Sequence, residues 1–178
     1  MATLGEAIRN DMQRLASCDA FVAYTDYVKS LLPRQKGVPK TLAIDYETAS
    51  LHWINIHGTC YDSLDQFRYG AFLGKGLYAA QLLHWFSFYS PSPERWKIVR
   101  SEDMFASPLK TLASVANWLG LAEFDFSSST QHVYNQSTQE PADAELQSVV
   151  RAFLEPHNRL LTALLCSNHL IPSCDPWW

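Results

Sequence analysis

The sequence predicts an α/β protein that is mostly α-helical, with one or two core strands. Apolar residues recur at steps of three and four through most of the chain, which is the spacing of amphipathic helices. Residues 96–100 instead have the short, β-branched pattern of a strand. A lone strand leaves its backbone groups unpaired, so we expect a partner sheet. The 178 residues, 47% hydrophobic and 18% charged, suit a single domain spanning residues 1–178.

Two helices are predicted near the N-terminus. Residues 4–15 form an amphipathic pattern, with apolar residues at helical spacing: Leu4, Ile8, Met12 and Leu15. Residues 20–32 predict a second helix that ends before Pro33. Residues 34–40 predict a loop, and residues 41–56 fit helical and strand spacing about equally well.

The middle of the chain predicts two helices around the strand. Residues 76–89 form a strongly apolar helix, which the Ser-Pro-rich residues 90–94 end. After the strand, Ser107 provides an N-cap and Pro108 the first helical position. This helix ends at Gly120, where a C-terminal cap glycine is expected.

The last third begins with a polar loop and continues as a helical stripe. Residues 127–140 are rich in Ser, Thr and Gln and predict the loop. Residues 146–165 carry apolar side chains at helical spacing, and Pro156 is expected to kink or divide this helix.

Composition and charge exclude several classes of partner. The net charge is −4, with acidic and basic residues interspersed, so we expect no nucleic-acid partner. No apolar run reaches the roughly 18 residues of a membrane span. The N-terminus lacks a signal-peptide pattern, so the chain as written is expected to stay in the cytosol.

The four cysteines are too scattered to predict a disulfide scaffold. Cys166 and Cys174 are close enough in sequence to pair in a secreted protein. With His169 they offer only three of the four ligands of a structural zinc site, so we expect no metal.

Four segments carry the chain's most distinctive patterns. In order they are Gly76-Leu-Tyr-Ala-Ala-Gln-Leu-Leu-His-Trp85, Trp96-Lys-Ile-Val-Arg-Ser-Glu-Asp103, Pro108-Leu-Lys-Thr-Leu-Ala-Ser-Val-Ala-Asn-Trp-Leu-Gly-Leu121 and Glu155-Pro-His-Asn-Arg-Leu-Leu161. With these gaps they resemble the C-terminal part of the carbohydrate sulfotransferase domain, in which a GxYxxxLxxW helix, a strand ending in Glu, a PxxTLxxVxxFLGL helix and a PxNxxL helix follow one another. The resemblance is clearest over residues 70–165 and is to the heparan- and chondroitin-type members.

The resemblance implies transfer of sulfate from 3′-phosphoadenosine 5′-phosphosulfate to a sugar hydroxyl or amine, without a metal, in the Golgi lumen. It implies the family's P-loop-like three-layer fold, to which this chain contributes mostly helices and one or two core strands. The implied partners are a carbohydrate acceptor and the N-terminal half of such a domain. In the family that half carries the phosphate loop, an Arg–Ser segment and the usual catalytic carboxylate, so we assign no catalytic residue here.

The resemblance also assigns binding residues. In heparan-type enzymes a basic loop before the last long helix wraps the donor's phosphates. The matching residues 134–141 keep its position but not its Lys and Arg, and we expect Asn135, Gln136 and Ser137 to donate hydrogen bonds to a phosphate. Tyr78 matches an aromatic position near the acceptor cleft, and Gln81 stands where some members carry a functional His, so both are expected to bind substrate.

A different class stays open: a non-catalytic helical interaction protein derived from a sulfotransferase. Residues 70–76 are one residue short of a phosphate loop and have no Ser or Thr after Lys75, which favours a simple turn. A further alternative makes residues 1–60 an unrelated helical module. Large apolar side chains of the matched helices are expected in the core: Trp85, Phe86, Trp118 and Leu119.

Overall fold

The computed structural model describes residues 3–32, 42–130 and 143–175, in which all regular structure is helical. The chain divides into two compact units, Met1–Ser90 with Ala142–Trp178, and Pro91–Pro141. The single-domain organisation expected for residues 1–178 stays a prediction.

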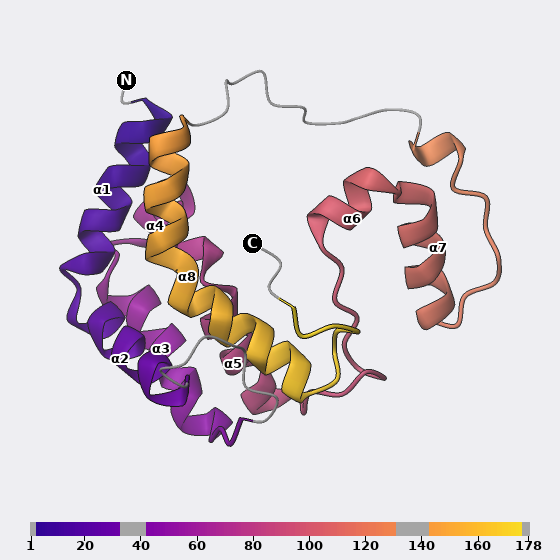
Figure 1. Ribbon diagram of the computed structural model, residues 1–178, viewed down its shortest axis with the longest axis horizontal. Coiled ribbons are helices and arrows are strands. Elements are labelled where there is room, and N and C mark those ends of the chain that lie inside the picture. Colours follow the sequence, from indigo (N-terminus) through magenta and orange to yellow (C-terminus); the bar gives the residue numbers. More distant parts are fainter. Residues whose placement is uncertain (1–2, 33–41, 131–142, 176–178) are drawn as a thin grey trace. The chain divides into compact units, whose positions relative to one another are not determined.

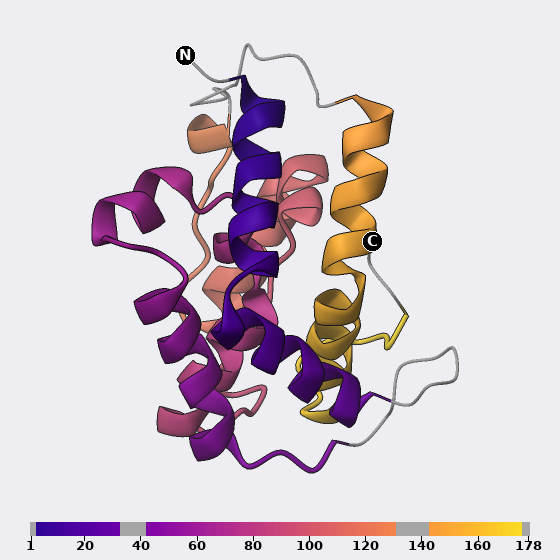
Figure 2. The same cartoon turned by 90° about the vertical axis from the view of Figure 1, so that its left-hand side faces the viewer.

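The first unit is a helical bundle (Figure 1). It consists of α1 (Leu4–Ala16), α2 (Asp19–Leu31), α3 (Tyr46–Thr59), α4 (Leu64–Gly70), the 3₁₀ turn η1 (Gly74–Gly76), α5 (Tyr78–Phe88) and α8 (Ala144–Ser167). Helix α5 packs against α3 and α8, and α2 packs against the same two helices. Figure 2 shows α1 and α2 meeting at a corner, with α3 and α8 on either side of α2.

Side-chain caps mark the starts of α1, α3 and α8, as the Ser63 hydroxyl does at α4. Thr3 and Glu6 form a capping box at α1, in which the Thr3 N–H donates to the Glu6 carboxylate over 2.7 Å. Asp45 accepts from the Glu47 and Thr48 N–H groups at α3. Asp143 accepts from the Leu146 N–H over 2.7 Å at α8.

The core of this unit is aliphatic and aromatic. Its largest fully buried apolar side chains are Leu15, Tyr24, Val28, Ile56, Leu77, Leu83, Leu160, Leu164 and Leu165. Most of the α8 contribution follows Pro156, which lies inside the helix without dividing it. The helix changes direction near its middle (Figure 1), as expected where a proline removes one backbone hydrogen bond.

The second unit contains α6 (Ser101–Ala106), α7 (Pro108–Trp118) and the 3₁₀ turn η2 (Ser128–Thr130). The predicted boundaries of α7 are confirmed: Ser107 precedes it, Pro108 begins it, and Gly120 follows with a positive φ of 69°. The Trp118 indole N–H donates to the Pro93 carbonyl over 2.8 Å.

The predicted α/β fold is wrong for the described residues, which contain no strand and no sheet. Residues 96–100, predicted as a core strand, lie in irregular structure between a turn and α6. Their β-branched side chains favour an extended backbone, but a strand needs a second strand to pair with. Within the segment whose period was ambiguous, residues 46–56 are helical and form most of α3.

Both pairs of cysteines form disulfides in the first unit. Cys18, at the start of α2, is bonded to Cys60, at the end of α3, with their Cα atoms 5.5 Å apart. Cys166, near the end of α8, is bonded to Cys174, with a Cα separation of 5.4 Å. No cysteine is left free. The second pair is the one that the sequence allowed, whereas the long-range first pair was missed.

Within the described ranges, no helix is both long and apolar enough to cross a bilayer.

Candidate functional site

Helix α5 separates a buried face from an exposed one. The buried face consists of small and apolar residues: Ala79, Ala80, Leu83 and Phe86. The opposite face carries Tyr78, Gln81, Trp85 and, at the C-cap, Tyr89, which recur at steps of three and four. Tyr78, Trp85 and Tyr89 are 60%, 51% and 54% exposed. Both residues assigned to substrate therefore lie on one accessible helix face.

The two residues assigned to substrate differ in how many of their polar groups are already hydrogen-bonded within the protein. The Gln81 amide nitrogen donates to the Lys75 carbonyl over 2.7 Å, which ties the first turn of α5 back to η1. Its amide oxygen has no hydrogen-bond partner among the described residues. The Tyr78 hydroxyl likewise makes no bond within the described ranges. This face thus offers one acceptor, and one group that both donates and accepts, to a ligand.

The second half of the exposed face is aromatic. The rings of Trp85 and Tyr89 are nearly parallel, with centroids 6.0 Å apart and planes at 28°. Phe88, 67% exposed, adjoins them and meets the His84 ring edge-on at 5.2 Å. The expectation that Trp85 lies in the core is wrong, as it is for Leu119, which is 56% exposed, whereas Phe86 is buried as expected at 3% exposed.

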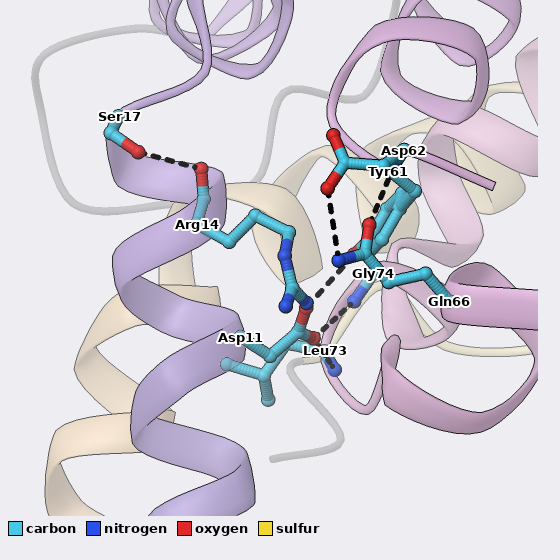
Figure 3. Close-up of polar contacts among 8 residues, drawn as sticks. All are labelled: Asp11, Arg14, Ser17, Tyr61, Asp62, Gln66, Leu73 and Gly74. Carbon is cyan, nitrogen blue, oxygen red and sulfur yellow. Dashed lines mark hydrogen bonds and ion pairs between the residues drawn. The ribbon is translucent and has the colours of Figure 1, made fainter.

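A buried polar cluster holds the segment that leads into α5 (Figure 3). Asp11 of α1, fully buried, accepts hydrogen bonds from the Leu73 N–H at 2.7 Å and the Tyr61 hydroxyl at 3.1 Å. Arg14, one turn later, lies 3.3 Å from the same carboxylate. Burial, followed by the Asp11 charge, raises the pKa of Tyr61, so its hydroxyl stays protonated and donates.

The Asp11 cluster is structural. Four groups surround its carboxylate, which leaves no oxygen turned toward a ligand: Arg14, Tyr61, Leu73 and Gly74. Asp11 was missed at the sequence level, although a polar residue between Ile8 and Leu15 on the apolar stripe is a usable signal.

The glycine-rich residues 70–76 form a turn, as the sequence favoured. The Gly74 N–H points to Asp11 at 3.4 Å, and the Lys75 ammonium donates to the Arg68 carbonyl. The groups that a phosphate loop would present to an anion are engaged within the protein.

Replacing Gly74 with alanine will lower the free energy of unfolding by about 2 kcal/mol. A Cβ at this position collides with the Tyr61 hydroxyl and lies 2.9 Å from the ring carbon that bears it, so the buried ring must move away from Asp11. Gly76→Ala is the matched control, because a Cβ there meets nothing within 4 Å. Urea denaturation of both variants tests this, and equal stability of the two would contradict it.

The remaining assigned residues, Asn135, Gln136 and Ser137, lie outside the described residues. The described part of the chain contains no group of three or more His, Cys, Asp or Glu side chains that could hold a metal ion. The pKa values that burial changes most belong to Tyr24, Tyr61 and His157, all below 5% exposed, and none lies on the α5 face.

Comparisons with known proteins give no relative. No protein-family model matches the chain, no curated protein is similar to it, and no solved structure matches its fold.

Proposed function

We propose that this chain is a sulfotransferase-family protein that binds the carbohydrate acceptor during sulfate transfer from 3′-phosphoadenosine 5′-phosphosulfate to a sugar hydroxyl or amine. One observation carries the proposal. Tyr78 and Gln81, which the family resemblance assigns to the acceptor, share an exposed face of α5 with two exposed aromatic rings. Exposed Tyr and Trp combine an apolar ring with a polar tip, and such residues suit an amphipathic ligand.

In this proposal the glycine-rich residues 70–76 do not bind the donor. The turn at residues 70–76 has its backbone and its lysine engaged internally. We assign the donor's phosphate contacts to Asn135, Gln136 and Ser137, whose neutral groups donate weaker hydrogen bonds than Lys or Arg would. The transfer uses no metal.

The Golgi lumen is the location that goes with this function. Both disulfides support it, because paired cysteines persist in oxidising compartments and are rare where thiols are kept reduced.

A non-catalytic interaction protein is the second candidate, and the unit Pro91–Pro141 favours it. Several of its large apolar side chains are exposed: Val99 41%, Phe105 81%, Leu109 47%, Leu119 56%, Leu121 61% and Phe124 66%. Large exposed apolar surfaces are typical of sites that bind another protein.

Adenosine 3′,5′-bisphosphate, the spent donor, will raise the thermal midpoint of the chain by several degrees. A ligand at 100 times its dissociation constant stabilises the folded state by about 2.7 kcal/mol. The measurement is thermal unfolding followed by circular dichroism, with adenosine 2′,5′-bisphosphate as a control of identical charge and composition. Replacing Asn135, Gln136 and Ser137 together with alanine is expected to remove most of the shift.

Two outcomes would contradict sulfate transfer. The first is an unchanged midpoint of the well-folded chain with the 3′,5′ compound, which would favour the interaction protein. The second is an equal shift with both isomers, because that response reports charge rather than a site for the donor.

A further inference from the structure

Two neighbouring aromatic rings on α5, those of Trp85 and Tyr89, are nearly parallel and are called here the aromatic pair. Both residues are about half exposed, at 51% and 54%. Their planes are within 28° of parallel. Two nearly parallel, half-exposed rings on one helix face give a ligand aromatic surface on which to stack.

The polar tips of the pair are also available. Neither the Trp85 indole N–H nor the Tyr89 hydroxyl has a hydrogen-bond partner within the described ranges. A ligand that covers both rings therefore needs an apolar face and, at its rim, hydrogen-bonding groups. A pyranose has this chemistry, because its axial C–H bonds form one apolar face and its hydroxyls surround it.

The pair continues the face that carries Tyr78 and Gln81. From Tyr78 to Tyr89 the helix rises by about 16 Å, which exceeds the width of one sugar ring. Carboxylates do not interrupt this stretch, since residues 78–89 contain no Asp or Glu. The surface suits several linked sugars laid along α5 better than a single monosaccharide.

We propose that the aromatic pair is a sugar-stacking subsite that holds one pyranose of the acceptor, while Tyr78 and the Gln81 amide oxygen hydrogen-bond to a neighbouring sugar. The choice of ligand class rests on the proposed function; the placement rests on the geometry of α5. Trp85 and Tyr89 act as binding residues with no part in the chemistry.

The test uses two probes, an unsulfated chondroitin hexasaccharide and chitohexaose, which share pyranose faces but differ in charge. Binding to the whole chain is measured by tryptophan fluorescence titration and by saturation-transfer NMR. We expect saturable binding of at least one probe, and we expect Trp85→Ala and Tyr89→Ala each to raise the dissociation constant about tenfold. Trp85→Phe, which keeps a ring, is expected to lose less.

Tyr69→Ala is the matched control. Tyr69 is 78% exposed on α4 and belongs to no described ring pair, so its loss removes an equally accessible aromatic from another surface. Its affinity for the probes is expected to equal that of the unmodified chain, and urea midpoints verify that every variant folds.

The proposal is overturned if neither probe binds, or if Trp85→Ala binds as tightly as the unmodified chain. These outcomes can be distinguished from those of the test with adenosine 3′,5′-bisphosphate. Sugar binding that depends on Trp85, without a response to adenosine 3′,5′-bisphosphate, would overturn sulfate transfer and keep the subsite. A bisphosphate response with Trp85-independent sugar binding would do the reverse.

Discussion

Replacing Cys18 and Cys60 together with alanine will lower the free energy of unfolding by about 4 kcal/mol at 25 °C. The two cysteines are 42 positions apart, so their bond removes much of the freedom of the unfolded chain. In the folded state it ties the corner between α1 and α2 to the end of α3. Urea denaturation without reductant measures the loss.

The second disulfide provides the matched control. Cys166 and Cys174 are only 8 positions apart, and the same relation gives about 2.5 kcal/mol for their replacement. The unmodified chain in reductant should approach the stability of a variant lacking all four cysteines. A larger loss for the short-range pair than for the long-range pair would contradict the prediction, as would a peptide map with different pairings.

The sequence predicted those structural features whose determinants all lie within one segment of the chain. Helices α1, α2 and α7 were predicted within one or two residues, because their stripes, caps and breakers are all read within one segment. The strand predicted at residues 96–100 was wrong for the converse reason, because a strand forms only by pairing with another strand elsewhere in the chain. The Cys18–Cys60 pairing is equally non-local.

The candidate site shows a different limit. Helix α5 is apolar on nearly every side, so its sequence does not reveal which face turns inward. Its small residues, Ala79 and Ala80, decide this by allowing close approach to the neighbouring helices, and Trp85 is left outside. Only three polar residues, Gln81, His84 and Ser87, interrupt its apolar sequence. Tyr78 and Gln81 were assigned through the family resemblance.

Lowering the pH from 6.5 to 4 will lower the free energy of unfolding of the first unit by about 3 kcal/mol because of one residue, His157. Its side chain is 3% exposed, and its ring lies 5.1 Å from Tyr24 and 5.2 Å from Phe21. Burial, with a smaller contribution from the positive charge of Lys29, lowers the pKa of His157 from 6.5 to about 4. The protonated form is disfavoured because aromatic rings replace water around it.

The direction follows from where protons bind. Between pH 6.5 and 4 the unfolded chain protonates this histidine while the folded chain does not, so acid favours unfolding. The stabilising contribution is complete above pH 6.5 and is lost as the pH falls to 4. Carboxylates also titrate near the lower limit, so the histidine must be isolated by substitution.

The variant His157→Phe isolates the contribution of the histidine, because a phenyl ring preserves the stacking with Tyr24 and does not titrate. The variant is expected to match the unmodified chain within about 1 kcal/mol at pH 7 and to exceed its stability by about 2 to 3 kcal/mol at pH 4. His52→Phe is the matched control: His52 also stacks on Tyr27, at 4.6 Å, but it is only half-buried. Its burial lowers the pKa too, without the large shift of His157, so a smaller difference is expected. An equal difference in free energy of unfolding between the unmodified chain and His157→Phe at pH 4 and at pH 7 would contradict the prediction. The histidine would then be hydrated in the folded state, and α2 would pack less closely against α8 than described.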